Sequence, residues 1–423
     1  MYDADWLPRL TALAGDTRSV PRWRVPSNVW GLGITSLLTD ASSEMVVSVL
    51  PAYLVLSAGL TPMALGVATG LHAAGPILAT WIGGVVADRS GRRKVTAVSG
   101  YALSAACRLG WWALMPGRVV SLLALFILGD RIGKAIRTAP RDAMISLSAH
   151  SDQMATAFGV HRALDAAGAA AGPLIAWVVL WQLPRRYDVV FFASFVLALL
   201  GLAALTLLVR DAPSPEATNA RAGRPTVTEA VAVFDDPRFG RVVLLAVAFS
   251  FVSIGDAFLY LLLLQRTQAG AQWIPLFYTG TAVSFLILAV PLGYVADRVG
   301  RRRVFILGHV ALLMTYGMVS SGVVPWPWAA GGSVLLLGMY YAASDGVLAG
   351  LAGAVLPSAT RATGLAWIAT GVGLGRLGSA LMFGFLSTRY GAPVAVTVFA
   401  VPLTIAIAGF ARDGREPTHG DGP

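Results

Sequence analysis

Ionisable side chains lie inside stretches of this chain that are otherwise apolar enough to cross a lipid bilayer. In the first such stretch, Ser36, Asp40 and Glu44 recur every four residues and therefore share one face of a helix. A charge at bilayer depth is costly, so it usually faces the interior of a helix bundle and is a functional candidate. Two acids one turn apart in a medium of low dielectric repel each other, which suits the binding and release of a proton. A purely structural role, as the partner of a buried arginine, is the alternative for Asp40.

A second group of charges lies in the sequence FGVHRALDAAGAAAGP, residues 158–173. His161 and Asp165 are one turn apart on the same helical face, and Arg162 lies to one side of them. Asp165 is the deeper residue of this group and needs a cationic partner, for which we consider Arg131 and Arg162. His161 fits either a proton relay or a polar residue at the membrane surface.

A third group of charges belongs to a predicted helix over residues 119–139, where Asp130 and Arg131 lie near the middle. Both are candidates for ion pairing or proton coupling. Further along, Arg137 and Arg141 are interpreted as anchors at the cytoplasmic end. Pro140 is expected to end or bend the helix there, because proline removes a backbone hydrogen-bond donor.

The second half of the chain holds fewer charges in its apolar stretches. Several of its residues are candidates to line a substrate cavity, together with Ser36 of the first stretch. They are Asp256, Tyr340, Tyr341, Asp345 and Arg376. Either Asp256 or Asp345 can pair with Arg376, and the sequence does not choose between them. For the two tyrosines, ordinary packing is an equally good reading.

The composition requires a membrane to hold these groups. The 423 residues are 56% hydrophobic and only 13% charged, with a mean hydropathy of +0.68, whereas a soluble domain is about 25% charged. The net charge of +10 is compatible with nucleic-acid binding. We favour the other explanation, an excess of arginine in the cytoplasmic loops of a membrane protein.

The predicted elements are twelve apolar stretches of about 20 residues, the length that a helix needs to cross a bilayer. They lie at 28–56, 62–87, 95–115, 119–139, 155–181, 188–209, 241–264, 274–296, 304–324, 328–356, 362–387 and 391–410. An even number places both termini on one side. If that side is the cytoplasm, 23 of the 32 Arg and Lys residues are cytoplasmic and five are in outer loops, as the positive-inside rule expects.

The chain is therefore expected to be an all-α integral membrane protein with twelve transmembrane helices in two pseudo-symmetric six-helix bundles. The predicted parts are a cytoplasmic N-terminus at 1–27, bundles at 28–209 and 241–410, a polar cytoplasmic linker at 210–240, and a cytoplasmic tail at 411–423. Tandem halves with a site between them are a transporter plan.

The two halves carry the same motif, G-x-x-x-D-R-x-G-R-R, after their second predicted helix. Its residues are Gly84, Asp88, Arg89, Gly91, Arg92 and Arg93 in the first copy, and Gly293, Asp297, Arg298, Gly300, Arg301 and Arg302 in the second. The first glycine of each copy permits close helix approach and the second permits a tight turn. Positive-inside topology explains the arginines of the motif, but not the repeated aspartate and glycines.

This motif resembles the cytoplasmic loop signature of the major facilitator superfamily, and the resemblance extends from about residue 28 to residue 410. It implies alternating access between the halves and a cytoplasmic gate formed by the motif residues. Gly159, Gly168, Gly172 and Pro173 also resemble the fifth-helix signature of proton-coupled exporters, although the pattern ends in Ala176 and Trp177 instead of glycines. Helix packing is the alternative explanation for these glycines.

The resemblance therefore implies a secondary transporter, with proton-coupled export of small molecules, such as drugs or metabolites, as the leading expectation. An importer or exchanger of small organic anions is the alternative, because arginines in the spans favour carboxylates or phosphates. An enzyme is not expected, since catalytic motifs such as HExxH and the phosphate loop are missing from the sequence. One cysteine, Cys107, leaves no intramolecular disulfide.

The expected partners are a small-molecule substrate, protons and the lipid bilayer, without nucleic acid. We expect no cofactor and no metal, the proton gradient as the energy source, and a monomer in the inner (cytoplasmic) cell membrane.

Overall fold

The computed structural model describes residues 25–75, 77, 93–114, 120–149, 153–211, 233–267, 270–321, 324–355 and 361–412, and the regular structure in these ranges is helical. The first half contains α2 (Ser27–Pro51) with a π-helical end η1 (Ala52–Ser57), α3 (Pro62–Ala73), α5 (Arg93–Leu114), α6 (Val120–Ser148), α7 (Met154–Gln182) and α8 (Tyr187–Leu208). The second half contains the short 3-10 helix η3 (Val233–Asp235), α10 (Pro237–Phe251), α11 (Asp256–Thr267), α12 (Trp273–Val299), α13 (Arg301–Ser320), α14 (Trp326–Val355), α15 (Arg361–Tyr390) and α16 (Ala392–Arg412). Most of the predicted N-terminal segment, of the linker and of the tail lies outside the described residues.

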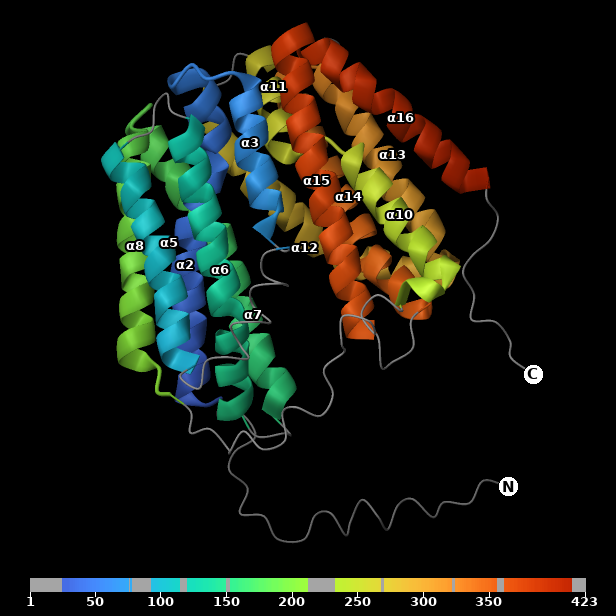
Figure 1. Ribbon diagram of the computed structural model, residues 1–423. Helices are drawn as coiled ribbons and strands as arrows, with labels where there is room; N and C mark the ends of the chain where they lie inside the picture. The colour runs from blue at the N-terminus through green and yellow to red at the C-terminus, as the bar shows by residue number, and fades with distance from the viewer. Residues whose placement is uncertain are drawn as a thin grey trace, which may run out of the picture.

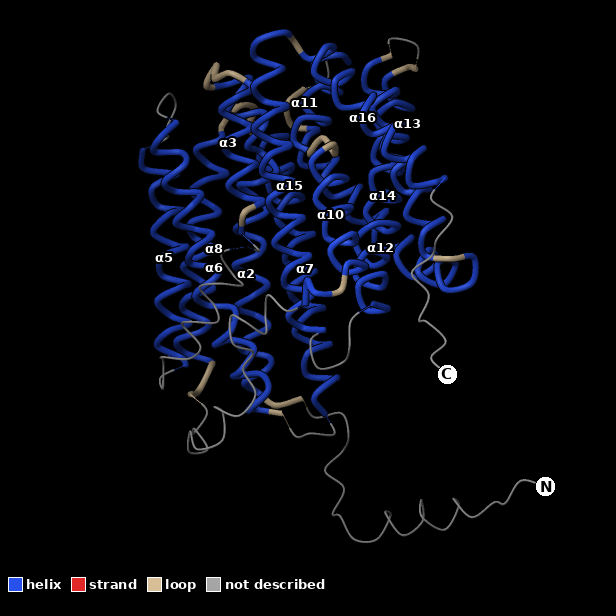
Figure 2. The backbone as a smooth tube through the Cα atoms, turned by 45° about the vertical axis from the view of Figure 1, so that its right-hand side comes forward, coloured by secondary structure: helices blue, strands red, loops and turns tan. Residues whose placement is uncertain are grey.

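The helices form two bundles that are joined at one end and diverge at the other. Figure 1 shows α2 and α5–α8 on one side, α10 and α12–α16 on the other, and α3 and α11 where the two sides meet. The same bundles of upright helices are seen after rotation in Figure 2. They diverge at the end where α2 begins and α8 ends (Figure 1).

Parallel contacts between glycines and backbone join the first and fifth helices of the first half. A Cβ atom at Gly168 would collide with the carbonyl oxygen of Leu37, and one at Gly172 would lie 2.5 Å from that of Ala41. On the other side of the seam, a Cβ atom at Gly33 would collide with Leu164. These contacts keep one constant offset between α2 and α7, so the two helices run side by side in the same direction.

The second half repeats this seam between α10 and α15. A Cβ atom at Gly371 would lie 3.0 Å from Val247 Cγ2 and 3.5 Å from Val243 Cγ1, and one at Gly375 would lie 2.7 Å from the carbonyl oxygen of Val247. Small residues let helix backbones approach closely where lipid provides no hydrophobic driving force. In both halves, therefore, the equivalent pair of helices packs through glycines.

The halves meet through α3 and α15, which run antiparallel. A Cβ atom at Gly66 would lie 2.5 Å from the carbonyl oxygen of Ala380, and one at Gly384 would lie 3.1 Å from Met63 Cα. The backbone N–H of Met63 also donates to Thr388 Oγ1 over 2.9 Å. The two bundles therefore close on each other at this end, opposite the end where they diverge.

The structure differs from the predicted helices in two places, and the first lies within the seventh span. The span predicted at 241–264 is interrupted at 252–255, between α10 and α11. The interruption is stable because Tyr316 Oη accepts from Ile254 N–H over 2.6 Å, and Ser379 Oγ donates to the carbonyl oxygen of Ser253 over 2.5 Å. Side chains here replace the lost helical hydrogen bonds, as buried backbone requires.

The other difference concerns α6, which continues through Pro140 to Ser148 instead of ending near residue 139. A proline removes one backbone hydrogen bond, a loss that neighbouring helices offset in membrane proteins. Lys134, Arg137 and Arg141 are consequently helical residues and do not belong to a cytoplasmic loop. Without these three residues, 20 of the 32 Arg and Lys residues remain on the side predicted to be cytoplasmic (23 − 3), against five in the predicted outer loops.

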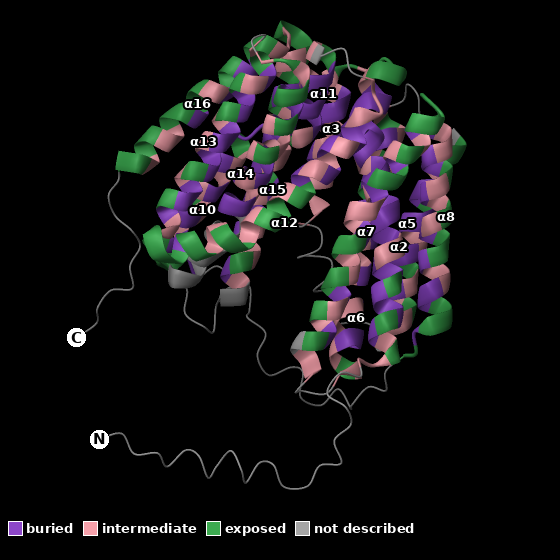
Figure 3. Ribbon diagram, turned by 180° about the vertical axis from the view of Figure 1, so that it is seen from behind, coloured by how far each residue is buried: buried purple, intermediate pink, exposed green. Residues whose placement is uncertain are grey.

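Within the described residues, seven helices are long and apolar enough to cross a membrane, as judged by length and composition. α6 is not among them, because two turns of this helix contain four charged residues: Asp130, Arg131, Lys134 and Arg137. Large apolar side chains such as Leu207, Leu286 and Val290 are exposed, which suits contact with lipid. Figure 3 shows exposed residues along α16 and α8 and buried residues between the helices.

The seam predicts opposite effects for two glycines of the same helix. A Cβ atom at Gly168 collides with backbone, whereas one at Gly159 meets no atom of the described residues within 4 Å. Gly168→Ala should therefore destabilise the protein by about 1–3 kcal/mol through overpacking, and Gly159→Ala should be neutral or slightly stabilising because alanine favours helix. Thermal unfolding of the purified protein in detergent measures both. Equal melting temperatures for the two variants would contradict the seam.

Candidate functional site

A cavity of ≈650 Å³ lies between the two halves. α2, α3 and α6 line it from the first half, and the interruption at 253–255 with α11, α12, α14 and α15 lines it from the second. Its titratable and aromatic lining residues are Glu44, His72, Arg131, Lys134, Asp256, Tyr278, Tyr340, Tyr341 and Arg376. Its size is typical of a site for a small molecule.

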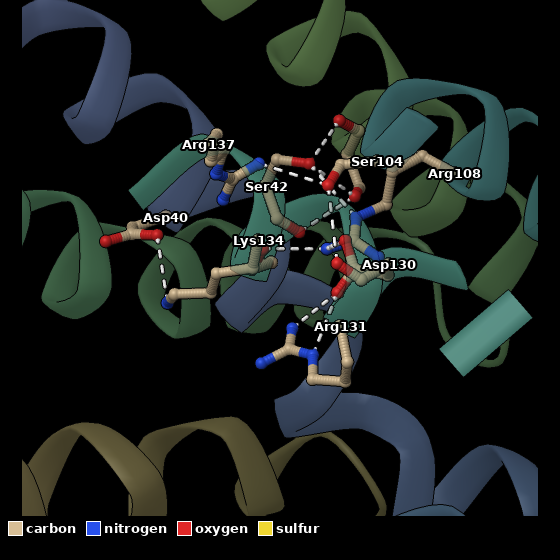
Figure 4. A network of polar contacts seen from close by, with 10 residues as sticks. Asp40, Ser42, Ser104, Arg108, Asp130, Arg131, Lys134 and Arg137 are labelled. Atoms are coloured by element: carbon tan, nitrogen blue, oxygen red, sulfur yellow. Dashed lines mark hydrogen bonds and ion pairs between the residues drawn. The ribbon is translucent and has the colours of Figure 1, made fainter. Parts of the chain in front are cut away.

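One buried carboxylate holds two arginines beside this cavity. Arg108 Nη2 lies 3.0 Å from Asp130 Oδ1, and Arg131 donates from Nε over 3.2 Å and from Nη2 to Asp130 Oδ2. Arg108 also donates to Ser43 Oγ on α2 over 2.7 Å. Figure 4 shows the three charged groups in one network. The network fastens α2, α5 and α6 together and fixes Arg131 at the cavity wall.

Two further bases of α6 reach into the bundle interior. Lys134 Nζ lies 3.6 Å from Asp40 Oδ1 (Figure 4). Arg137, only 2% exposed, donates to Ser104 Oγ over 3.1 Å, and its guanidinium lies 4.3 Å from the centre of the Tyr101 ring. The interpretation of Arg137 as a surface anchor is therefore wrong, because it is buried between α5 and α6.

Arg141 is half-buried and joins two polar groups. It donates to Asp142 Oδ1 over 3.0 Å and to Ser36 Oγ over 3.3 Å. Ser36, predicted to line the substrate cavity, is instead buried as this acceptor and is not among the residues that line the cavity. Glu44, two turns further along α2, does line the cavity.

The carboxyl groups of Asp40 and Asp165 face each other across α2 and α7, close enough to share a hydrogen bond. Within the described part of the chain, Asp165 Oδ1 is buried without a hydrogen-bond partner. Two carboxyl groups in contact cannot both ionise without a large cost, so such a pair tends to retain one proton. This pair is separate from the cavity lining, and Lys134 connects the two.

The expected partners of Asp165 are corrected by this arrangement. Arg131 is held by Asp130, and Arg162, three residues before Asp165 on α7, is exposed and forms no ion pair with it among the described residues. His161 is buried on the α2 side, and neither ring nitrogen finds a hydrogen-bond partner among the described residues. His161, Asp165 and the seam glycines therefore do form one stripe, but neither predicted cationic partner of Asp165 is paired with it in the described structure.

In the second half, polar groups gather around the interruption of the seventh span. Tyr341 Oη donates to Asp256 Oδ1 over 2.5 Å, and Tyr340 Oη donates to Ser253 Oγ over 3.3 Å. Arg376 lines the same cavity as Asp256. Four of the predicted cavity residues, Asp256, Tyr340, Tyr341 and Arg376, thus lie together, whereas the side chain of Asp345 is outside the described residues.

Of the two motif copies, the structure describes the second and only Arg93 of the first, at the start of α5. Gly84, Asp88, Arg89, Gly91 and Arg92 lie outside the described residues. Gly300 connects α12 to α13 with φ +105°, a backbone conformation that favours glycine.

The charges of the second copy also make contacts. Asp297 pairs with Arg301 over 3.4 Å, Arg298 covers the Tyr294 ring, and Arg302 donates to the carbonyl oxygen of Phe410 on α16. A Cβ atom at Gly293 would meet nothing within 4 Å among the described residues. The close approach predicted at Gly293 is thus not seen within the described part of the chain.

Sequence reasoning missed three residues of this site. Arg108 is visible as an arginine within a predicted span, but no sequence spacing connects it to Asp130 on another helix. In the sequence, Lys134 lies close to the helix end that was expected at Pro140. In the structure it lies one turn after Asp130, inside α6. His72 lines the cavity from the last turn of α3 and carries no motif.

The shared carboxylate predicts a large loss of stability when it is neutralised. Asp130→Asn leaves Arg108 and Arg131 buried without an anion, which should cost about 3–5 kcal/mol. Asp188→Asn is the matched control, since its pair with Arg186 is exposed to solvent and should change stability little. Thermal unfolding in detergent compares them, and a similar melting temperature for both would show that Asp130 does not hold the cluster.

Known proteins resemble this chain over most of its length. It is 29% identical over 371 residues to an uncharacterized MFS-type transporter of Methanocaldococcus jannaschii, covering 85% of this chain and 88% of that protein. It is 27% identical to an uncharacterized protein of Mycobacterium tuberculosis, covering 94% of this chain and 95% of that one.

Solved structures share the fold at low sequence identity. A crystal structure of the nucleoside transporter NupG matches 90% of this chain and 98% of its own, with a TM-score of 0.75 and 14% identity. A bacterial homolog of the human lysosomal transporter Spinster, inward-facing and unoccupied, gives a TM-score of 0.72 and 16% identity, covering 93% and 97% of the two chains. A D-xylose-proton symporter gives 0.68 and 15%, covering 92% and 98%.

The sequence profile of the Major Facilitator Superfamily matches residues 32–285, and this span includes the carboxyl pair, the arginine cluster and most of the residues that line the cavity. With its helical spans arranged in two bundles around one cavity, this chain belongs to the Major Facilitator Superfamily and is a multi-pass membrane transporter, not an enzyme.

Proposed function

We propose that this transporter exports small molecules in exchange for protons, and that Asp40 and Asp165 form its proton site. The observation that supports this proposal is the contact of two carboxyl groups inside the first bundle, with Lys134 as a close cation. A proton on this pair neutralises one of two adjacent negative charges, so its arrival and departure change the electrostatic balance of α2, α6 and α7. A change of that kind can bias two arrangements of the bundles.

Alternating access would use the two ends of the molecule. The halves touch along α3 and α15 at one end and diverge at the other (Figure 1). We propose that the protein is a monomer in the inner membrane, with both termini in the cytoplasm. In that orientation the cavity opens toward the cytoplasm. Rocking of the bundles would then separate α3 from α15 and close the diverging end. The contacts of Asp297, Arg301 and Arg302 near that end suit the role of a cytoplasmic gate.

Export is the direction favoured by the fifth helix. Its exporter-like glycines, Gly168 and Gly172, are the ones that press α7 against α2. This seam brings Asp165 within reach of Asp40. The helix that resembles exporters is therefore also the helix that builds the proton site.

A second candidate function is the import or exchange of small organic anions. The observation that favours it is the cavity lining, in which Arg131, Lys134 and Arg376 outnumber the acids Glu44 and Asp256. Guanidinium groups bind carboxylates and phosphates with paired hydrogen bonds. Asp130 occupies two nitrogens of Arg131, and among the described contacts this leaves Nη1 for a ligand.

Proton coupling predicts a specific defect in two variants. In proteoliposomes with an imposed pH gradient, Asp40→Asn and Asp165→Asn should lose transport driven by the gradient. Both should keep exchange of substrate across the membrane, because neither residue lines the cavity. Asp188→Asn is the control with wild-type activity expected. Gradient-driven transport by both variants at the wild-type rate would disprove the proton site.

The two candidate functions differ in the charge of the substrate. A panel of matched organic anions and cations, tested for an increase in melting temperature, identifies the class that binds. The second candidate predicts stabilisation by anions that is lost in Arg376→Gln, because removing a cavity cation weakens anion binding. Competition by cations for the same site would count against anion transport.

A further inference from the structure

Lys134 belongs to two sites at once. Its ammonium lies 3.6 Å from Asp40 of the carboxyl pair, and the same side chain lines the substrate cavity. Its side chain is 41% exposed, whereas that of Asp40 is 12% exposed. The lysine therefore reaches from open space in the cavity to a buried acid behind the wall.

Arg131, a neighbouring cavity base on α6, differs from Lys134 in how firmly it is held. Arg131 is fixed by hydrogen bonds from Nε and Nη2 to Asp130. Within the described residues Lys134 has a single ion pair, longer than a normal hydrogen bond, and an ammonium with three donors on a flexible stem. Its contact with Asp40 is thus the one that a ligand in the cavity can exchange at low cost.

The electrostatic surroundings of Asp40 are defined by three helices. The charged and titratable groups that face it are Glu44 on α2, Lys134, Arg137 and Arg141 on α6, and His161 and Asp165 on α7. α8 packs against α2 with Ser194, which does not titrate. Among these cations, Arg137 is bound to Ser104 and Arg141 to Asp142 and Ser36, so Lys134 is the one placed to move between Asp40 and the cavity.

We propose that Lys134 couples the proton site to the substrate cavity, so that an anionic substrate binds together with a proton whereas a cationic substrate displaces one. This inference rests on the proposed proton site at Asp40 and Asp165. It adds the residue that transmits the effect and a rule that connects substrate charge to the direction of coupling. Lys134 is a positioning residue for the proton site, since it acts through Asp40.

The sign follows from Coulomb's law. An anion in the cavity attracts Lys134 away from Asp40, and the carboxyl pair without its cation then takes up a proton. A cation in the cavity repels Lys134 toward Asp40, which stabilises the ionised carboxylate and releases the proton. Export in exchange for protons therefore requires a substrate with a positive group, and anions would travel with a proton in the same direction.

The test uses charges tethered at a neutral cavity residue. Thr138 lies one turn after Lys134 and lines the cavity. In a Cys107→Ala background, Thr138→Cys is modified with a sulfonatoethyl, aminoethyl or methyl methanethiosulfonate, which adds an anion, a cation or a neutral group through a disulfide. Infrared spectra across a pH series then follow the absorption band of a protonated carboxyl group. The band that belongs to the proton site is the one that disappears in Asp40→Asn.

We expect the midpoint of this carboxyl titration to move up by about one pH unit with the tethered anion and down with the tethered cation, relative to the methyl group. Both shifts should become small in Lys134→Gln and be restored in Lys134→Arg, which keeps the charge. Thr69→Cys on α3, also a cavity residue, repeats the measurement if the first variant folds poorly.

Equal shifts with and without Lys134 would overturn the coupling role, because the tethered charge would then act on Asp40 directly. No shift with either charge would overturn it as well. A carboxyl band that remains unchanged in Asp40→Asn would instead disprove the proton site on which the inference rests. The two failures are therefore distinguishable in one experiment.

Discussion

A charge buried in a membrane bundle needs a partner of opposite sign within reach, and the first half of this protein is organised by that requirement. Asp130 lies between Arg108 and Arg131, so one carboxylate holds two cations and three helices. Removing one partner from such a cluster costs several kcal/mol, since the remaining charges stay in a medium of low dielectric. The cluster therefore fixes α6, and α6 in turn places Arg131 and Lys134 on the cavity wall.

The carboxyl pair departs from this rule, and the departure is what suggests function. Asp40 and Asp165 face each other with one nearby lysine at 3.6 Å, and Asp165 Oδ1 lacks a hydrogen bond within the described chain. The glycine seam between α2 and α7 enforces this proximity, because Gly168 and Gly172 bring the two backbones into contact. Packing thus supplies the energy that holds the two acids together, and in the proposed mechanism a proton relieves their repulsion.

Much of this arrangement follows from the sequence. Periodicity places Asp40 and Glu44 on one face and aligns His161 and Asp165 with the seam glycines, and the repeated motif reveals the two halves. Contacts between helices do not follow, because the sequence pattern does not show which faces meet, and the role of Arg108 was missed for this reason. Local rules also fail where tertiary contacts outweigh them. Pro140 lies inside α6, and Tyr316 and Ser379 stabilise an interruption that apolar composition conceals.

The central claim is that Asp40 and Asp165 share one proton, and a count of titrating protons tests it most directly. Potentiometric titration of the purified protein in detergent, between about pH 5 and pH 9, compares wild type with Asp40→Asn, Asp165→Asn and the double variant. The account predicts that each single variant loses the same one proton and that the double variant loses no more. Additive losses of two protons, or no loss in either single variant, would contradict a shared proton site.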